Sequence, residues 1–363
     1  MTESGGMNSL RIYAGPRARA HLEKNGLSPE NVGIVPAAAG GPKGLILGPL
    51  DRFIFGDWLA SSTHRVDLVG ASIGAWRMAT ACLKEPISAF SRLERDYIAQ
   101  DYELPPGRKT PLASHVSERF SANLEAFYGG RIREVLDSPR YKLHILTSRG
   151  RHVLGREHKI ATPLGYIGAF LSNALHRRVM GAWLERVLFS TDEKLPFDAS
   201  DYRTRRVALT EANFNASLQA SCSIPFVLKA VHDIPGAPAG AYWDGGITDY
   251  HLHLDYDRAG SGPLVLYPHF QKAIVPGWLD KGLKWRHGAT HFLDNTIVLA
   301  PDSEWIARLP NAKLPDRTDF ARHGTDLKAR VTAWSTAASA AAQLADEFAA
   351  WLEKPDPARV EAL

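Results

Sequence analysis

A serine flanked by two glycines lies near residue 70, directly after a short apolar run. Residues 66–76 read VDLVGASIGAW and contain the pattern G-x-S-x-G, with Ser72 between Gly70 and Gly74. The glycines suit a tight strand-to-helix turn that exposes the serine hydroxyl, because a Cβ there would clash where strand and helix pass closely. The N-terminus of the following helix would favour an oxyanion beside Ser72. The pattern predicts a nucleophilic serine. The alternative is a tightly packed turn whose serine has no catalytic role.

A glycine-rich stretch upstream could supply the hydrogen-bond donors that a tetrahedral oxyanion needs. The stretch AAAGGPKG contains Gly40, Gly41 and Gly44, which would leave backbone N–H groups uncovered at the end of a strand. Pro42 has no N–H and cannot donate, whereas Lys43 adds a cation near any anionic group. A tight turn or a phosphate loop is the alternative, but neither G-x-x-x-x-G-K-[ST] nor G-x-G-x-x-G is met.

A serine hydroxyl is a poor nucleophile at neutral pH, so this chemistry also needs a base. Asp244 ends the short apolar run GAYWD, and Gly245 and Gly246 follow it at once. The glycine pair would allow a sharp turn that leaves the carboxylate facing a crowded site. Burial would raise the pKa of that carboxylate and make it a usable base within hydrogen-bond reach of the serine.

Histidines offer a second kind of base. His251 and His253 form an H-x-H pattern shortly after Asp244, and His269 follows the apolar run PLVLYP. The chain order Ser…Asp…His, with Ser72, Asp244 and His269 for example, is that of an α/β-hydrolase triad. The H-x-H pair could instead lie on an ordinary surface segment, or hold a metal ion on one strand face, although no third ligand is evident.

Four separated motifs resemble the patatin-like phospholipase family: AAAGGPKG, GASIG, ASCSIPF and WDGG, in that order between residues 32 and 246. The resemblance implies a three-layer α/β/α sandwich in which Ser72 is the nucleophile and Asp244 completes a two-residue dyad without histidine. It also implies that residues 220–225 pack beside the site. The oxyanion and substrate-binding loop would then contain Gly40, Gly41, Lys43 and Gly44.

Two stretches depart from the pattern of that family. Pro42 stands where many members have glycine, which bears on the donor geometry of the loop. After D-G-G the family often continues toward an Asn and a Pro, whereas this chain reads ITDY at residues 247–250. The second departure concerns the lip of the substrate site and leaves the dyad intact.

The resemblance implies a serine acyl hydrolase that cleaves carboxylic ester bonds of lipids, usually phospholipid or lysophospholipid acyl chains, through an acyl-enzyme. A dyad suits esters because one carboxylate must serve both as base and as acid, and alcohols leave with less help than amines. No cofactor and no metal ion is expected, since neither H-E-x-x-H nor a calcium-loop spacing occurs. A Ser-Asp-His esterase and a non-catalytic acyl-lipid binding protein on the same scaffold are the alternatives.

Residues 163–189 combine apolar side chains with a basic centre at residues 176–178. This stretch could form an amphipathic surface near the site that admits an acyl chain and meets anionic head groups. A core-facing helix with a solvated polar stripe is the alternative. Polar and charged residues interrupt the apolar run at 169–189, so no membrane span is predicted there.

The composition is that of an ordinary globular protein. The chain has 363 residues and a net charge of +4, and its basic clusters are too short to predict nucleic-acid binding. Cys82 and Cys222 lie far apart in no C-x-x-C pattern, which favours buried thiols in a reducing compartment. With no signal-peptide pattern at the N-terminus, we expect a cytoplasmic protein, with peripheral contact at a membrane surface left open. The oligomeric state does not follow from the sequence.

The elements that must position these residues follow a β-α-β-α order. Apolar runs at residues 32–37 and 66–69 predict buried strands, each followed by a short glycine-rich loop and a helical pattern, which argues for a parallel sheet covered by helices. Further strands are predicted at residues 141–147, 207–210, 241–243, 264–267 and 296–300. Helices are predicted at residues 16–25 and 326–353.

We therefore predict an α/β fold, a three-layer α/β/α sandwich with a mostly parallel central sheet and a helical insertion. Residues 1–28 are expected to form an N-terminal leader and a short helix. Residues 29–310 would be the patatin-like catalytic domain, with the helical insertion at about 112–190. Residues 311–363 would be a C-terminal helical segment packed on that domain.

Overall fold

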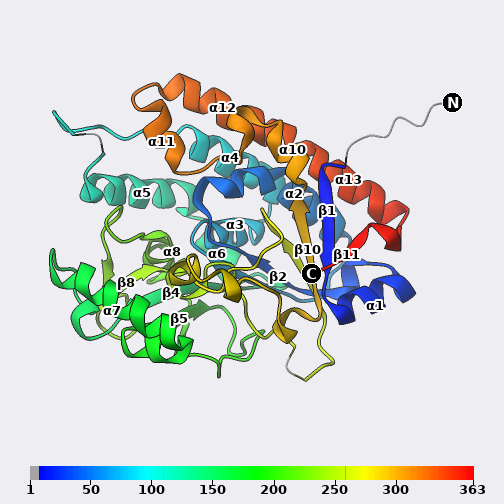
Figure 1. Cartoon of the computed structure of the whole chain (residues 1–363), viewed down its shortest axis with the longest axis horizontal. Coiled ribbons are helices and arrows are strands. Elements are labelled where there is room, and N and C mark those ends of the chain that lie inside the picture. The colour runs from blue at the N-terminus through cyan, green and yellow to red at the C-terminus, as the bar shows by residue number, and fades with distance from the viewer. Residues whose placement is uncertain (1–7, 109, 258) are drawn as a thin grey trace.

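One sheet of eleven strands organises the computed structural model, which describes residues 8–108, 110–257 and 259–363 (Figure 1). The order is β11-β1-β10-β9-β2-β3-β4-β5-β6, with β8 beside β4 and β7 beside β8. The central run β10-β9-β2-β3-β4 is parallel throughout. The strands are β1 (Leu10–Ala14), β2 (Val32–Ala37), β3 (Val66–Ala71), β4 (Tyr141–Gly150), β5 (Leu184–Ser190), β6 (Thr204–Ala208), β7 (Val231–His232), β8 (Ala241–Asp244), β9 (Leu264–Pro268), β10 (Thr296–Pro301) and β11 (Val360–Ala362).

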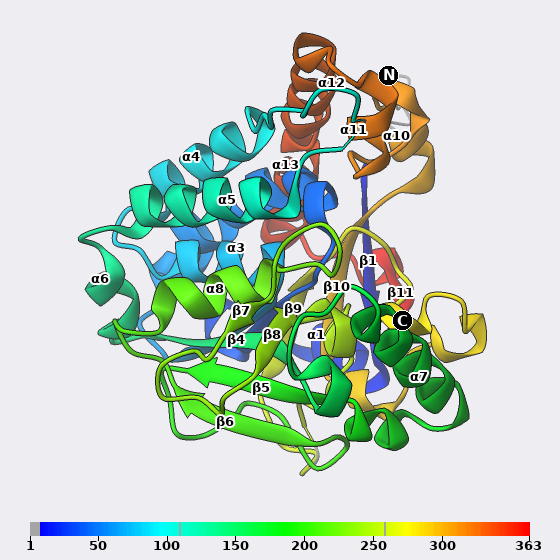
Figure 2. The same cartoon turned by 90° about the vertical axis from the view of Figure 1, so that its left-hand side faces the viewer.

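Helices cover both sides of this sheet. The views in Figures 1 and 2 place α3, α4, α5, α12 and α13 together on one side, whereas α1 and α7 lie away from that layer. The predicted α/β class with a mostly parallel central sheet is confirmed. The helices are α1 (Pro16–Asn25), α2 (Gly48–Phe53), α3 (Ile73–Ala81), α4 (Pro86–Ile98), α5 (Ala113–Tyr128), α6 (Ile132–Leu136), α7 (Ala161–Leu175), α8 (Phe214–Cys222), α9 (Gly246–Asp249), α10 (Ser303–Ala307), α11 (Thr318–His323), α12 (Leu327–Ala340) and α13 (Ala342–Glu353).

The central strands are buried on both faces, as parallel strands between two layers must be. In β3, Val66 and Leu68 belong to the large core beneath the helices. Val69 and Ala71 belong to a second apolar cluster on the other face, where the segment around Leu252 packs against them. Apart from Asp67, which bonds His144, the apolar residues of this strand follow from its position in the middle of the sandwich.

Strand β4 pairs along one edge with two different strands in succession. Its first part pairs in parallel with β3, up to the pair Ala71 and Leu146. Its next residues pair with the antiparallel strand β8, beginning at the pair Asp244 and Thr147. Because Thr147 directly follows Leu146, the C-terminal ends of β3 and β8 meet at adjacent positions of β4. This register brings the residue after β3 face to face with the last residue of β8.

Two predictions along the chain need correction. The segment at 112–190 contains β5 as well as the expected β4, and its helix α7 ends at Leu175, so this segment is not simply a helical insertion. The expected N-terminal leader within residues 1–28 lies partly outside the described residues, but Leu10 and Arg11 belong to β1, which pairs with β10 and β11. Both chain ends therefore contribute to the sheet.

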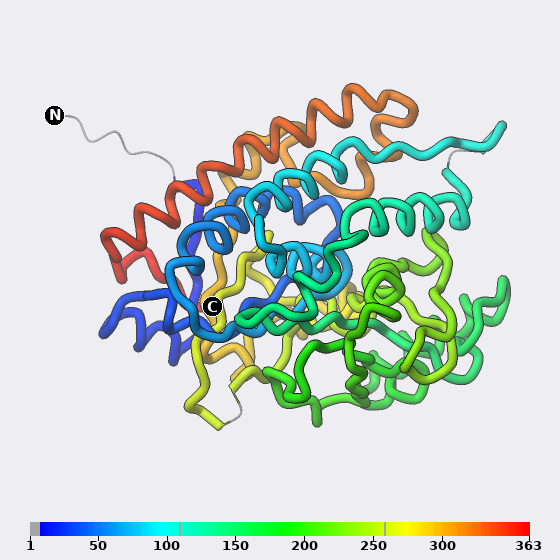
Figure 3. Tube along the Cα trace, turned by 180° about the vertical axis from the view of Figure 1, so that it is seen from behind, coloured from blue at the N-terminus to red at the C-terminus, as the bar shows by residue number. Residues whose placement is uncertain are grey.

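The predicted closing helix is two helices, α12 and α13, that follow one another along the outside of the molecule (Figure 3). Helix α13 packs on α2 and β1. The predicted helix at 16–25 coincides with α1, whose end at Gly26 has a φ of 69°, a conformation that glycine adopts without strain. Within the described residues, no helix is long and apolar enough to cross a membrane.

Candidate active site

Ser72 and Asp244 form a buried hydrogen-bonded pair at the point where β3 and β8 meet. Ser72 Oγ donates to Asp244 Oδ2 over 2.7 Å. The two residues are 3% and 5% exposed, so the pair is almost removed from bulk water while it lines a cavity. The structure thus joins two residues that the sequence analysis selected separately, 172 positions apart.

The backbone at Ser72 is strained. Ser72 follows β3 and precedes α3, with φ 57° and ψ −130°, a region that non-glycine residues seldom adopt. The flanking glycines permit this turn, since a Cβ on Gly74 would lie 1.9 Å from the Ala37 carbonyl oxygen and one on Gly70 would lie 2.4 Å from Ala75 Cα. The turn places Ser72 at the N-cap position of α3, as the G-x-S-x-G pattern predicts.

Burial controls the charge state of Asp244. Desolvation raises the pKa of this carboxyl above its usual range, while the positive charge of Arg317 and the hydrogen bond from Ser72 act in the opposite direction. The second carboxylate oxygen, Oδ1, accepts the Gly246 N–H over 2.7 Å and so fixes the orientation of Oδ2 toward the serine. Gly245 packs so tightly that a Cβ would lie 2.2 Å from the Leu146 carbonyl oxygen.

The end of α8 holds the nucleophile and the base together. Ser221 Oγ accepts the Ser72 N–H over 2.9 Å and donates to the Leu146 carbonyl over 2.6 Å. The carbonyl of Ser221 accepts the Gly245 N–H, and the carbonyl of Ser223 accepts the Asp244 N–H. The ASCSIP stretch thus bonds to both sides of the pair, a role that its sequence position beside the site did not specify.

A cavity of about 210 Å³ opens above Ser72 and Asp244. Its apolar wall includes Ile224, Pro225 and Trp278. Three cationic residues also line it, and none of them forms an ion pair with a described residue: Lys43, Lys281 and Arg317. Two carboxylates, Asp244 and Asp316, line it as well, and Asp316 pairs with Lys313, so the cavity combines an apolar wall with three cations and two anions.

Two of these cations lie against aromatic rings. Lys43 Nζ is 5.0 Å from the centre of the Phe270 ring, and Lys281 Nζ is 4.0 Å from that of Tyr250. Burial, together with the charges of Arg317 and Lys43, lowers the pKa of Lys281 to about 8. Because burial lowers the pKa of both lysines, a negatively charged neighbour would stabilise their charged forms.

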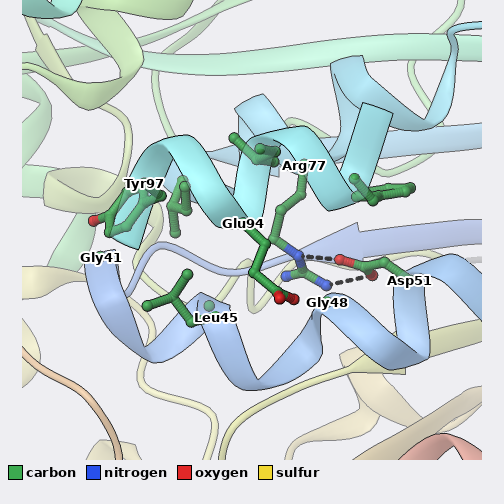
Figure 4. Close-up of a pocket in the computed structure, with 11 residues that line it drawn as sticks. Gly41, Leu45, Gly48, Asp51, Arg77, Glu94 and Tyr97 are labelled. Atoms are coloured by element: carbon green, nitrogen blue, oxygen red, sulfur yellow. Dashed lines mark hydrogen bonds and ion pairs between the residues drawn. The ribbon is translucent and has the colours of Figure 1, made fainter. Parts of the chain in front are cut away.

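The glycine-rich loop faces two cavities. Gly40 and Lys43 line the cavity above Ser72, whereas Gly41 and Gly44 line a small cavity behind the loop (Figure 4). The Gly40 and Gly41 N–H groups donate to no acceptor in the described part of the chain. Of the predicted loop residues, Gly40 and Lys43 line the cavity above Ser72, whereas Gly41 lies against Arg317 and Gly44 against Ile73.

A buried ion pair supports the loop and α3 from behind. Arg77 of α3 donates to both carboxylate oxygens of Asp51 of α2, over 2.6 and 2.7 Å, and Figure 4 shows the pair beside the small cavity. Both side chains are almost fully buried, so this two-pronged pair ties the helix after Ser72 to the helix after the loop. No sequence pattern pointed to these residues, because partners 26 positions apart form no motif.

The three candidate histidines lie elsewhere. His251 Nδ1 and His269 Nδ1 make their contacts with backbone groups of residues 271–275, and His253 pairs with Thr290. Burial lowers the pKa of His251 well below its usual range and that of His269 to about 3. None of the three lines the cavity or hydrogen-bonds Ser72 or Asp244. The arrangement favours a dyad over a triad.

The remaining candidate residues have structural surroundings. Both cysteines are free and buried, and desolvation raises the pKa of the Cys222 thiol well above its usual range, so no thiolate forms beside Ser72. Among the described residues, no group of three or more His, Cys, Asp and Glu side chains is arranged to hold a metal ion.

In comparisons with known proteins, no protein-family model and no curated protein matches this chain. The geometry of the described residues therefore carries the functional argument. It provides a hydroxyl at a strained turn, a desolvated carboxylate bonded to it, and an adjoining cavity, which together suit acyl transfer to a serine.

We expect the change Ser221→Ala to lower ester turnover by about tenfold, with most of the loss in kcat, because a buried Ser72 N–H loses its acceptor and the turn loosens. Steady-state kinetics on a soluble ester measure this. Ser223→Ala is the matched control, since among the described residues that hydroxyl bonds only to the Gln219 carbonyl of the preceding helix, away from Ser72. Equal losses in the two variants would contradict the positioning role.

The electrostatics of Asp244 predict the pH dependence of activity. Because only the ionised carboxylate accepts a proton, kcat/KM should fall as the pH falls through the raised pKa of Asp244. Arg317→Met removes a charge that lowers this pKa, so the acid limb should move to higher pH. Arg322→Met is the matched control, because the Arg322 side chain, on the helix that follows Arg317, donates to Asn311 Oδ1, and this variant should leave the limb in place. A shift of the Arg317 variant to lower pH would refute the assignment.

Proposed function

We propose that this protein is a serine acyl hydrolase that cleaves carboxylic ester bonds of lipids, with phospholipid or lysophospholipid acyl chains as substrates. The observation that carries the proposal is the 2.7 Å hydrogen bond from Ser72 Oγ to Asp244 Oδ2 at the floor of a cavity. The resemblance of four motifs to the patatin-like phospholipase family supports the same reaction and the same two residues.

In the proposed reaction, Asp244 Oδ2 takes the proton of Ser72 Oγ as that oxygen attacks the carbonyl carbon of the ester. The oxyanion forms at the N-terminal end of α3, where the Ile73 N–H and the uncommitted Gly40 N–H are the candidate donors. Asp244 then returns the proton to the departing alcohol. A water molecule, deprotonated by the same carboxylate, hydrolyses the acyl-enzyme and releases the fatty acid.

The cavity lining supports a lipid ester with an anionic group. The apolar wall at Ile224, Pro225 and Trp278 suits an acyl chain. Lys43, Lys281 and Arg317 offer unpaired positive charge to a phosphate near the scissile bond. A carboxylate that must also protonate the leaving group favours an ester over an amide.

Neither alternative function has comparable support. A Ser-Asp-His esterase needs an imidazole at the serine, and the candidate histidines contact other groups. A lipid-binding protein without catalysis needs neither the strained serine nor its bond to a buried carboxylate. Such strain costs about 1–3 kcal/mol and persists where a function requires it.

The first test is the change Ser72→Ala, which should abolish ester turnover and leave the fold intact because it removes one oxygen from a turn. A fluorophosphonate probe should label the wild-type protein at Ser72 and should not label the variant. Circular dichroism provides the control for folding. Equal labelling of both proteins would refute the assignment of the nucleophile.

The second test separates the dyad from a triad. Asp244→Asn keeps the volume and removes the proton acceptor, so kcat should fall by roughly 10²–10⁴-fold, the usual contribution of a general base. His251→Ala, His253→Ala and His269→Ala should each retain most activity if they remain folded. A folded histidine variant as inactive as Ser72→Ala would overturn the dyad.

A further inference from the structure

One face of helix α7 is apolar and exposed to solvent. Its large side chains recur at helical spacing along that face and its N-terminal approach, and each is more than half exposed. They are Ile160 (68%), Leu164 (61%), Ile167 (56%), Leu171 (58%) and Leu175 (82%). So many neighbouring exposed aliphatic side chains are unusual on a monomer surface and mark a surface that another apolar phase covers. We refer to these five residues as the docking face.

Helix α7 is firmly anchored behind this face. On its inner side Asn173 is fully buried and donates to Asp280 Oδ1 over 2.8 Å. Arg286 donates to the Asn173 and Ala174 carbonyls near the helix C-terminus. Trp183 Nε1 donates to Ser172 Oγ over 2.9 Å. The docking face is therefore a fixed surface of a well-packed helix.

The docking face lies beside the cavity above Ser72. Tyr166 of α7 is in ring contact with Phe226, at 6.2 Å between centroids, and Phe226 is itself 64% exposed. The two residues before Phe226, Ile224 and Pro225, line the cavity, as does Trp278, whose short helix packs on α7. These contacts run from the buried side of α7, through the exposed Phe226, to residues that line the cavity.

The charged residues within α7 and its two flanks are all basic. Between His158 and Leu184 the chain has no aspartate or glutamate, whereas Lys159 lies at one end of α7 and Arg177 and Arg178 at the other; Arg177 pairs with Asp249 and Asp280. Lys159 and Arg178 are exposed. An apolar strip with basic residues at its ends is complementary to a lipid surface that carries negative head groups.

We propose that the docking face seats this protein on an anionic lipid bilayer, with its aliphatic side chains among the acyl chains and with Lys159 and Arg178 at the head groups. The inference rests on the proposed lipid substrate only for the role of membrane docking, since the exposed apolar face is observed whatever the substrate. Seated in this way, α7 and the exposed Phe226 bring the neighbouring cavity toward the bilayer that holds the proposed ester substrate. Figure 2 shows α7 at the edge of the molecule, away from α12 and α13.

The experiment measures vesicle binding in a Ser72→Ala background, so that its outcome does not depend on catalysis. The Ser72→Ala protein, called the background protein below, should cosediment with mixed phosphatidylcholine–phosphatidylglycerol vesicles and bind vesicles of pure phosphatidylcholine more weakly. Adding the double change Ile167→Asp and Leu171→Asp should weaken binding by roughly tenfold or more, because charge enters the buried face. Ile87→Asp is the matched control, an aliphatic residue of α4 that is 51% exposed, and it should bind like the background protein.

A second variant keeps the test independent of folding. Lys159→Gln with Arg178→Gln alters only exposed polar positions and should weaken binding to the anionic vesicles and reduce its salt dependence. With Ser72 restored, both double variants should hydrolyse a soluble short-chain ester at the wild-type rate and vesicle lipid more slowly.

Three results would overturn the proposal. One is that the protein fails to bind anionic vesicles, and another is that both double variants bind as the background does. The third is a stable dimer that dissociates on the Ile167 and Leu171 changes, since a second copy would then cover the docking face. If the double variants lose vesicle binding but hydrolyse a soluble ester normally, the docking face is supported. If proteins that retain Ser72 hydrolyse no ester at all, only the proposed hydrolase activity is contradicted.

Discussion

The candidate site depends on the register of a single strand. Strand β4 offers one edge first to β3, running parallel, and then to β8, running antiparallel. The pairs Ala71 with Leu146 and Asp244 with Thr147 stand next to each other on β4, so the two strand ends meet. Backbone hydrogen bonding, which leaves little freedom along a strand, therefore sets the distance between hydroxyl and carboxylate. A shift by one residue in either pairing would turn the side chains to opposite faces of the sheet.

The strained serine imposes a second requirement, because a positive φ at a residue with a side chain must be held by its surroundings. Ser221 takes the Ser72 N–H, and the glycines of the turn allow β2 and α3 to approach. The Arg77–Asp51 pair holds α3 against α2 from behind. Removing one partner of such a buried pair typically costs about 3–5 kcal/mol, so these contacts keep the turn in one conformation.

Much of this site could be predicted from the sequence, because local chemistry dictated it. The glycines around Ser72 and after Asp244 mark positions where no Cβ fits, and the structure gives each a contact below 3 Å for an added Cβ. The sequence did not reveal what depends on distant pairing. Ser221 is one serine among many until α8 packs on β4, and no spacing rule links Arg77 to Asp51.

The helical prediction for residues 112–190 failed at β5 for an equally physical reason. Glu185 and Arg186 interrupt an apolar run in a way that is typical of the polar side of a helix, yet both are buried in β5. Arg186 bonds Asp249 and Asp201, and Glu185 bonds Arg149, so tertiary ion pairs replace solvent. The same network explains part of the ITDY departure after D-G-G, since Asp249 serves the sheet and not the substrate site.

Desolvation acts on the acidic and the basic groups of the cavity at once. It makes Asp244 a better base by raising its pKa, and it lowers the pKa of Lys281 to about 8. Lys43 and Arg317 add to the second effect by repulsion, while Arg317 moderates the first. An anionic ester entering this cavity would stabilise the charged Lys281 and raise its pKa, whereas a neutral ester would leave the cations to repel one another. Binding linkage of this kind would favour an anionic ligand over a neutral one, because the preference arises from cations that line the cavity without an ion pair to a described residue.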